Sequence, residues 1–473
     1  MKKIFGLIWL AFSCQHVVAQ FMSNNNAFIS IKDKAMVSVL GDIYNLKSGH
    51  FNNSDTIYLT GNWTNNASNH AFDSIDAGYV YFWANADQII KGTSETYFYN
   101  LILKNGGIKY ADIDAKVDGF LDLTDREFSV DTNTIWVRNP LLNAVRRTSG
   151  FLSSLEDGGL LRHTNQSGIY LFPVGSSRIF TRYRPIEITP NSAAFNIYKA
   201  RFANTDATSE GFDREQRFHL LCQINPYWYH RLYHPTGSDS AKLNFFFDPA
   251  ADGNWNELAH WENRPEWEPM VHDQLINGTP FTSISKNNWN NFNSKAFALA
   301  IYNPPFAQAG VDTLIWKYDT IQLQASGGFD YTWTPAQTLS CNDCSQPMAF
   351  PLTSTIYYLT VKNELGCVDY DSLYLLVKDK PFSLLDIPNV ITPNGDGYND
   401  VWHIGALDRY PDNEVRIINR WGSEVFYQKN YQQNWAGTYK NDPSPGGSYY
   451  YIIKIKNNAG EVASFDGPIT ILR

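Results

Sequence analysis

The stretch IPNVITPNGDGYNDVWHI at 387–404 sets a pattern that continues to the end of the chain: short apolar segments separated by turn-forming residues. Its Asn394–Gly397 segment (NGDG) should turn tightly, because glycine tolerates positive φ and Asn and Asp side chains bond to their own backbone. VRIINRWGSEVFY at 415–427 and PGGSYYYIIKI at 445–455 alternate as two-faced strands do. These residues predict a small β-sandwich.

Five motifs follow one another in this region: TPNGDGYND at 392–400, NRWG at 419–422, WAG at 435–437, GSYYY at 447–451 and ILR at 471–473. Together they resemble the gliding-motility-associated C-terminal domain, an immunoglobulin-like sandwich that is the type B sorting signal of the type IX secretion system of Bacteroidetes. The motif positions taken over from this family are Thr392, Pro393, Asn394, Gly395, Asp396, Gly397, Asn399, Asp400, Asn419, Arg420, Trp421, Gly422, Trp435, Gly437 and Arg473.

The resemblance implies export to the cell surface or the medium after transit through the periplasm, with the outer-membrane export machinery as partner. Two positions depart from the family. Ala436 stands where the family usually has Asp, and Pro468 should interrupt the last strand. The resemblance says nothing of what the rest of the chain does outside the cell.

The N-terminus has the pattern of a secretory signal peptide over 1–19. Lys2 and Lys3 precede an apolar stretch, and small residues at Val17 and Ala19 predict cleavage between Ala19 and Gln20. A lipoprotein signal using Cys14 is the alternative, although the bulky Phe12 is unfavourable for it. The apolar stretch is too short to span a membrane as a helix.

Composition favours a multidomain, all-β protein. The chain has 473 residues, which is too long for one core, with 15% aromatic and only 18% charged residues. The net charge is −9 and no basic run occurs, so that nucleic acid is not expected as a partner.

Four domains are predicted after the signal peptide. In 20–148, β-rich segments such as TIYLTGNW at 56 recur about every twenty residues, as in a β-solenoid, although an ordinary β-sandwich with evenly spaced strands gives a similar pattern. Denser strands predict a β-sandwich over 149–303. Residues 306–379, with Trp333 as core tryptophan, resemble the PKD-like and immunoglobulin-like modules of bacterial surface proteins, and 384–473 is the sorting domain.

Three cysteines, Cys341, Cys344 and Cys367, lie within the third domain, and export permits a disulfide among them, with the pairing left open. Zinc is the alternative for the Cys341-x-x-Cys344 pair, but no fourth ligand or histidine lies nearby.

A structural calcium ion is the one cofactor that the sequence suggests. Asn394, Asp396 and Asp400 place oxygen-bearing side chains around a glycine-rich turn, and the segment from Asp248 to Asn256 does the same with Asp252. Asx-turns in which these side chains bond to their own backbone are the alternative at both loops.

No catalytic motif is assembled: the nucleophile elbow, the P-loop, the dinucleotide fingerprint and the HExxH zinc motif are all missing. His230 with His234, and the acidic residues Asp122, Asp125 and Glu127, lack the partners that metal or glycosidase chemistry needs. We therefore expect a secreted or surface structural or adhesive protein that is not an enzyme, with surface glycans or other surface proteins as possible ligands. The alternative is a secreted carbohydrate-binding or glycan-processing protein, with a sugar platform formed by Trp228, Trp255, Trp261, Trp267 and Trp289.

Overall fold

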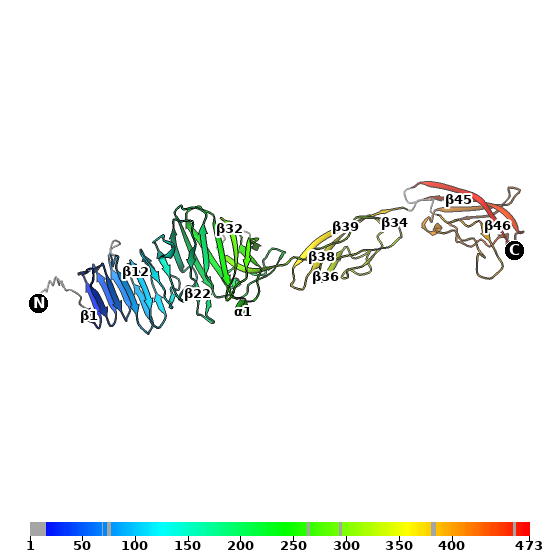
Figure 1. The fold of residues 1–473 in the computed structure, drawn as a ribbon. Helices are drawn as coiled ribbons and strands as arrows, with labels where there is room; N and C mark the ends of the chain where they lie inside the picture. Colours follow the sequence, from blue (N-terminus) through cyan, green and yellow to red (C-terminus); the bar gives the residue numbers. More distant parts are fainter. Residues whose placement is uncertain are drawn as a thin grey trace. The chain divides into compact units, whose positions relative to one another are not determined.

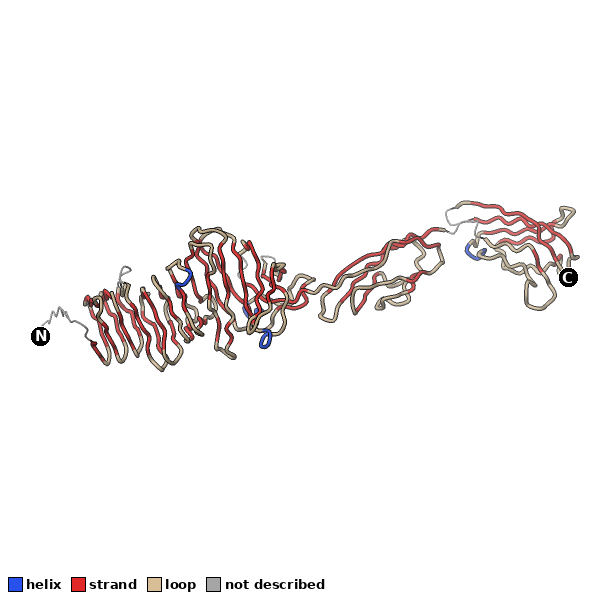
Figure 2. Tube along the Cα trace, in the orientation of Figure 1, coloured by secondary structure: helices blue, strands red, loops and turns tan. Residues whose placement is uncertain are grey.

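Strands dominate the structure, a computed structural model (Figure 2), and the prediction of an all-β, multidomain chain is confirmed. It describes residues 16–68, 70–72, 77–262, 265–292, 296–379, 385–456 and 460–473, with the backbone only at 16–19. The predicted signal peptide therefore lies largely outside the described residues. The chain divides into two compact units, 1–304 and 305–473.

Helices in the described ranges are single turns, and none has the length and apolar character that crossing a membrane requires. They are η1 (Leu142–Ala144), η2 (Ala207–Glu210), α1 (Pro249–Asp252) and η4 (Leu407–Arg409).

The first unit begins as a β-solenoid, drawn in blue to cyan in Figure 1. Each rung contributes strands to successive faces, and equivalent strands pair in parallel with those of the next rung. Met36 lies opposite Thr56, and Thr56 opposite Tyr79, at spacings of 20 and 23 residues. Parallel pairing between consecutive repeats distinguishes a solenoid from an antiparallel sandwich. Of the two interpretations of the N-terminal repeats, the solenoid is therefore confirmed.

Three faces make up the solenoid. The first contains β1 (His16–Ala19), β4 (Met36–Val39), β7 (Thr56–Leu59), β9 (Tyr79–Trp83), β12 (Asn100–Lys104), β15 (Leu121–Asp122) and β18 (Val145–Arg146). The second contains β2 (Met22–Asn25), β5 (Ile43–Lys47), β8 (Trp63–Ala67), β10 (Gln88–Gly92), β13 (Lys109–Ala111), β16 (Glu127–Ser129) and β19 (Phe151–Ser153). The third has β3 (Phe28–Ile31) with β6 (His50–Asn53), and later β11 (Thr96–Phe98), β14 (Ala115–Val117), β17 (Thr134–Val137) and β20 (Gly159–Thr164).

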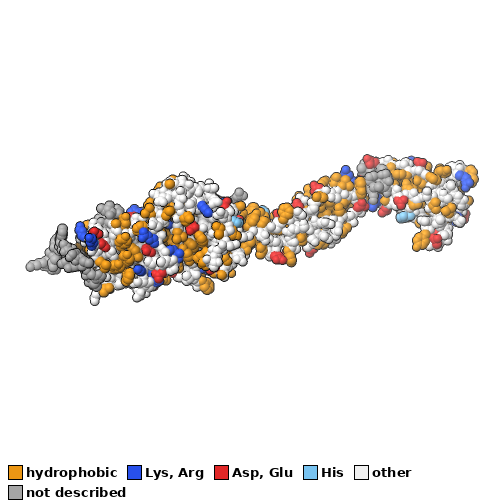
Figure 3. All heavy atoms as spheres, viewed as in Figure 1, with side chains coloured by type: hydrophobic (Ala, Val, Ile, Leu, Met, Phe, Trp, Pro, Cys, Tyr) orange, Lys and Arg blue, Asp and Glu red, His pale blue; other side chains and the backbone are white. Residues whose placement is uncertain are grey.

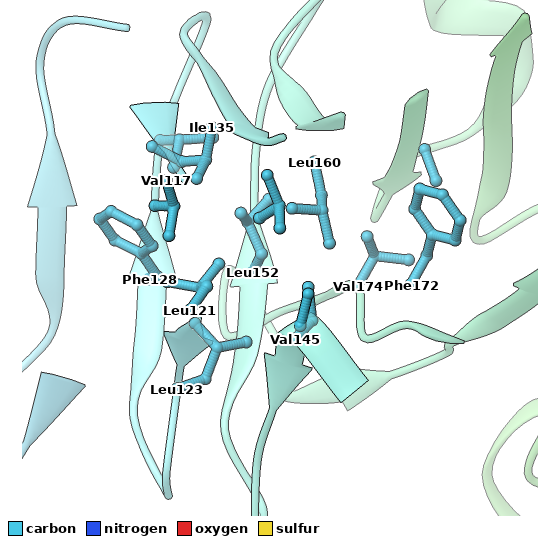
Figure 4. Close-up of a cluster of buried hydrophobic side chains, with 14 of the residues drawn as sticks. Val117, Leu121, Leu123, Phe128, Ile135, Val145, Leu152, Leu160, Phe172 and Val174 are labelled. Atoms are coloured by element: carbon cyan, nitrogen blue, oxygen red, sulfur yellow. The ribbon is translucent and has the colours of Figure 1, made fainter. Parts of the chain in front are cut away.

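Apolar side chains from all three faces fill the interior of the stack. Figure 4 shows this core in the last rungs, where Val117, Leu121 and Phe128 come from three different strands and point toward one another. Phe172 and Val174, beyond the stack, belong to the same cluster. The core therefore continues from the solenoid into the following sheets.

Buried asparagines support one corner of the early rungs. Asn24, Asn45 and Asn65 occupy the same register position in β2, β5 and β8. The Asn45 amide donates to Asn65 Oδ1 at 3.1 Å and to the Gly49 carbonyl at 3.0 Å. Amide side chains can satisfy backbone groups where the chain leaves β geometry, which accounts for the asparagine-rich repeats.

Strand β20 connects the solenoid to an antiparallel sheet, because it pairs in parallel with β17 and antiparallel with β25. This sheet continues through β25 (Asn196–Ala203), β27 (Tyr229–Thr236), β33 (Ala296–Tyr302), β29 (Glu257–Trp261) and β30 (Trp267–Pro269), and β26 (Leu221–Ile224) also pairs with β33. A second antiparallel sheet has β21 (Tyr170–Phe172), β24 (Ile186–Pro190), β28 (Ala241–Phe247), β32 (Thr282–Trp289) and β31 (Gln274–Ile276), and a small ladder pairs β22 (Gly175–Ser176) with β23 (Arg182–Tyr183).

The second unit contains two separate hydrophobic clusters. Trp333, expected as a core tryptophan, is fully buried in the cluster whose members lie between Ala307 and Leu375. The strands around it are β34 (Thr313–Trp316), β39 (Val368–Lys378), β38 (Thr355–Lys362) and β36 (Asp330–Thr334), with a ladder of β35 (Ile321–Gln322) and β37 (Met348–Ala349).

Residues 385–473 form a five-stranded sheet and have a hydrophobic core of their own. It contains β40 (Val390–Ile391), β46 (Val462–Ile471), β45 (Gly447–Lys456), β41 (Asn413–Ile418) and β42 (Glu424–Lys429), beside the small hairpin of β43 (Thr438–Tyr439) and β44 (Asp442–Pro443). The expected break at Pro468 is wrong, since β46 runs through it opposite Tyr450. On its other side β46 pairs only at Thr470 and Ile471, so the missing N–H of proline interrupts no second ladder there.

Candidate functional site

The glycine-rich loop of the C-terminal domain is organised around one carboxylate. Asp400 Oδ1 accepts hydrogen bonds from the backbone N–H of Asn394 (3.0 Å) and Gly395 (2.7 Å), and Oδ2 accepts one from Gly397 (2.8 Å). Gly395 and Gly397 have φ of +84° and +86°, which explains the need for glycine. The N–H donors of Gly395 and Gly397 lower the pKa of Asp400, because they stabilise the ionised form.

Asn394 and Asp396 are engaged with each other and with the same loop. Asn394 Oδ1 accepts from the Asp396 N–H at 3.1 Å, and its amide donates to Asp396 Oδ2 at 2.9 Å. Asp396 Oδ1 accepts from the Tyr398 N–H at 2.8 Å. The side-chain oxygens of the predicted calcium ligands thus form the Asx-turn network that was the alternative. Within the described ranges no group of three His, Cys, Asp or Glu side chains is placed to hold a metal ion.

Two of the domain's tryptophans fix this loop to the core. Trp402 Nε1 donates to the Pro388 carbonyl at 2.6 Å, and the Trp402 N–H donates to the Trp435 carbonyl at 2.8 Å. Tyr431 Oη accepts from the Trp435 N–H and donates to the Trp402 carbonyl. All three rings are buried, and burial raises the pKa of Tyr431. Trp435 of the WAG motif is therefore a core residue of the domain.

Gly437 and Arg473 meet at the far end of the same motif. A side chain at Gly437 would come within 3.2 Å of Ile391 and Ile471, and its φ is +66°. The Arg473 guanidinium donates to the Gly437 carbonyl at 2.9 Å. The terminal arginine thus closes the edge of the sheet against the WAG turn.

The NRWG motif forms the turn between β41 and β42. Asn419 Oδ1 accepts from the N–H of Trp421 (3.1 Å) and of Ser423 (2.9 Å), and Gly422 takes φ of +82°. The Trp421 ring, in contrast, is 80% exposed. This motif therefore combines a fixed backbone with a large apolar side chain in water.

A cavity of about 510 Å³ adjoins this turn and extends to the β43–β44 hairpin. Sequence patterns drew attention to Arg420 and Trp421 but not to Tyr439, Lys440 and Ser444 on the facing side. Lys440 and Asn441 both take positive φ in the turn between β43 and β44. Asn is typical of such turns and Lys is not, so the signal in the sequence was weak.

The cysteines and acidic residues singled out in the sequence make contacts that stabilise the fold. A disulfide joins Cys341 and Cys344, so these two sulfurs are not available as zinc ligands, and the Cys344 carbonyl accepts from Trp333 Nε1 at 3.0 Å. Of the acidic residues, Glu127 accepts a hydrogen bond from Ser153 at 2.6 Å, while Asp125 pairs with Arg126.

The histidine pair does not form a site. His230 is buried among Phe202, Trp228 and Phe245, and its Nε2 donates to the Arg184 carbonyl at 2.8 Å. His234 stacks on another aromatic ring instead. Burial lowers the pKa of His230 to about 4, so the ring is neutral near pH 7.

In the second candidate calcium loop, other protein groups bind the side-chain oxygens of Asp248 and Asp252. Asp252 is buried, its Oδ2 accepts from Arg184 Nε at 2.5 Å, and its Oδ1 accepts from Trp228 Nε1 at 3.1 Å. Asp248 caps helix α1 by accepting from the Ala250 N–H at 3.0 Å. This loop is built around an ion pair.

The alternative of a sugar platform is not supported, because these tryptophans serve as core residues. Trp228 and Trp267 are fully buried, Trp255 and Trp289 nearly so, and Trp261 packs edge-on against Trp267. Large aromatic side chains bury the most apolar area per residue, which explains their density in this part of the chain.

Comparison with known proteins identifies the C-terminal domain. The profile of the CHU_C type IX secretion signal domain matches residues 385–471. No curated protein matches the chain. Among solved structures, dimeric latent PorU from Porphyromonas gingivalis is similar over 61% of this chain and 31% of its own, at 9% identity and a TM-score of 0.15. The human Desmocollin-1 ectodomain is similar over 62% of this chain and 66% of its own, at 9% identity and a TM-score of 0.16.

The profile match covers the loop, the turn and the buried tryptophans described above. A chain with this domain interacts with the type IX secretion machinery and is exported to the cell surface or released. Residues 385–471 are therefore a type IX secretion signal domain.

Proposed function

We propose that the chain is a non-catalytic structural or adhesive protein of the cell surface or the medium, exported through residues 384–473. The match of 385–471 to the type IX secretion signal domain carries the export part of this proposal. A hydrophobic core of its own, formed by Trp402, Trp435 and the strands around them, supports a domain that is recognised as a folded unit. The proposed order before it is signal peptide 1–19, solenoid 20–148, sandwich 149–303 and spacer 306–379.

Exposed aromatic rings on the first solenoid face support the adhesive part. Tyr58 and Tyr81 stack at 4.6 Å between ring centroids, and Trp83 contacts Tyr58 edge-on. Tyr79 and Trp83 are 39% and 37% exposed. Rings with an apolar body and a polar edge are common at protein-binding surfaces. Figure 3 shows hydrophobic side chains on this part of the chain, with acidic and basic groups interspersed around them.

Secretion of a truncated chain tests the export proposal. Deleting 384–473 should leave the protein in the periplasm of its native host, because the signal peptide takes it only across the inner membrane. Fusing 384–473 behind a signal peptide and a fluorescent protein should bring the reporter to the surface or the medium. Normal export of the truncated chain would overturn the proposal.

A further inference from the structure

We propose that the Trp421 turn and the cavity beside it form the surface by which the signal domain docks on a protein of the export machinery. This inference rests on the proposed export function. It names the docking surface: Arg420, Trp421, Glu424, Tyr439, Lys440 and Ser444.

Trp421 has an exposure that the fold does not explain. Its side chain is 80% exposed, whereas Trp83, the next most exposed tryptophan of the described ranges, reaches 37%. An indole left in water forgoes the large burial energy that aromatic side chains provide in cores and interfaces. Tryptophan and arginine are also the residues most enriched among those that dominate protein–protein binding energy.

The turn keeps its shape without the indole. Asn419 accepts from two backbone N–H groups, its own N–H donates to the Ser423 carbonyl at 2.9 Å, and the Gly422 N–H donates to the Asn419 carbonyl at 3.0 Å. Only the backbone of Trp421 takes part in these bonds. Removing its side chain should therefore leave the domain folded.

Gly447 leaves the space that the Arg420 side chain occupies beside the cavity. A Cβ at Gly447 would lie 2.7 Å from Arg420 Nη2, so the guanidinium rests directly on the Gly447 backbone. Its centre is 5.5 Å from the Trp421 ring centroid, within the range of a cation–π contact. The two side chains that most often anchor protein interfaces thus stand together at the rim.

Ser444 supplies a hydroxyl that no described residue of the domain satisfies. It lines the cavity and is only 5% exposed, and its hydroxyl has no hydrogen-bond partner within the described residues. Buried hydroxyls are nearly always paired, and an unpaired one costs about 1–3 kcal/mol. The hydroxyl itself is covered in the free domain, so a partner group can form this missing hydrogen bond only when the wall of the cavity shifts.

The charges at the rim favour a protein as the occupant. Arg420 and Lys440 lie beside Glu424 and Asp442, so the cavity carries both signs. Nucleic acid is bound mainly through Lys and Arg side chains that contact phosphates, and acidic groups beside them oppose this binding. A volume of about 510 Å³ accommodates one or two inserted side chains of a partner. Because the cavity lies in a domain that interacts with the export machinery, a protein of that machinery is the occupant that we assign.

Export of full-length variants in the native host tests the inference. Trp421→Ala should lower the extracellular amount at least tenfold and raise the periplasmic amount, with Trp421→Phe retaining part of the export. Tyr427→Ala is the matched control, because Tyr427 is an exposed ring on β42 that does not line the cavity. The control should be exported normally. Trp421→Ala should melt within about 2 °C of the wild type, which shows that loss of export is not loss of folding.

The outcomes separate this inference from the export proposal. If deletion of 384–473 blocks export and Trp421→Ala is exported like the wild type, the docking surface is wrong and the export function stands. If the deletion variant is exported, the export function itself fails. Sedimentation of the purified chain tests a second copy as occupant. A wild-type dimer that Trp421→Ala converts to monomer would overturn the assignment to the machinery.

Discussion

Asp400 illustrates how one side chain can determine a motif. Its two oxygens accept three backbone N–H groups of a loop whose glycines alone permit the required φ values. The sequence predicted a tight turn at this place from residue types. It could not decide between a cation and backbone N–H groups as the partners of the carboxylates, because both use the same oxygens at the same spacing.

Replacing Asp400 tests its role. Asp400→Ala should lower the melting temperature of the domain, since three N–H groups lose their acceptor, whereas Asp400→Asn keeps one acceptor oxygen and should cost less. The measurement is thermal unfolding followed by circular dichroism. Calcium binding remains a prediction, tested in the same assay. If calcium binds, a chelator lowers the wild-type melting temperature. Equal melting in chelator and in millimolar calcium would leave only the hydrogen-bond role.

Acid should destabilise the first unit through its buried histidines. Burial lowers the pKa of both His230 and His260 to about 4, against about 6.5 in an unfolded chain. Between these values the unfolded chain binds more protons, so stability is complete above pH 6.5 and is lost as the pH falls toward 4. The maximal loss is about 3 kcal/mol for each histidine at 1.36 kcal/mol per pKa unit.

The variant His230→Gln isolates the contribution of His230 to the loss of stability in acid. It should be less stable than the wild type at pH 7, because the hydrogen bond to Arg184 and the ring packing are altered, yet it should lose less stability between pH 6.5 and 4.5. Chemical denaturation at several pH values measures both quantities. Parallel pH curves for the two proteins would contradict the assignment.

At the level of elements, repeat spacing was more informative than strand propensity. A period near twenty residues predicted the solenoid, and the rungs pair at spacings of 20 and 23 residues around Thr56. The transition at β20 was not predictable, because a strand that pairs in parallel on one side and antiparallel on the other has no distinctive sequence. The buried position of His230 was missed for a related reason, since alternation along β27 does not show which second sheet covers it.

The asparagine corner of the rungs gives an element-level prediction. Asn65 is fully buried, donates to the Glu95 carbonyl at 2.8 Å and accepts from Asn45 at 3.1 Å. Asn65→Ala should destabilise the first unit by about 1–3 kcal/mol for each buried polar group left without a partner. Asn66→Ala at the exposed neighbouring position is the control and should cost less, as measured by denaturant unfolding.

At the level of the whole molecule, the sequence located the export signal but not the surface that it presents. Ordered motifs such as NRWG marked the domain at 384–473, and the profile match at 385–471 agrees with them. The cavity was not predictable, because Ser444 and Lys440 approach Trp421 only after the hairpin β43–β44 has folded beside β42. Motif spacing identifies residues that shape the backbone. Which side chains remain available to a partner depends on three-dimensional packing.

The constant register of the rungs also has an evolutionary consequence. Because each rung contacts only the one before and the one after it, a duplication or loss of one complete repeat leaves all other pairings unchanged. Insertion of a single residue within a strand would instead move the side chains that follow it in that strand to the opposite face. Related chains should therefore differ in the length of this segment in steps of about twenty residues, and each added step would lengthen the solenoid by one rung.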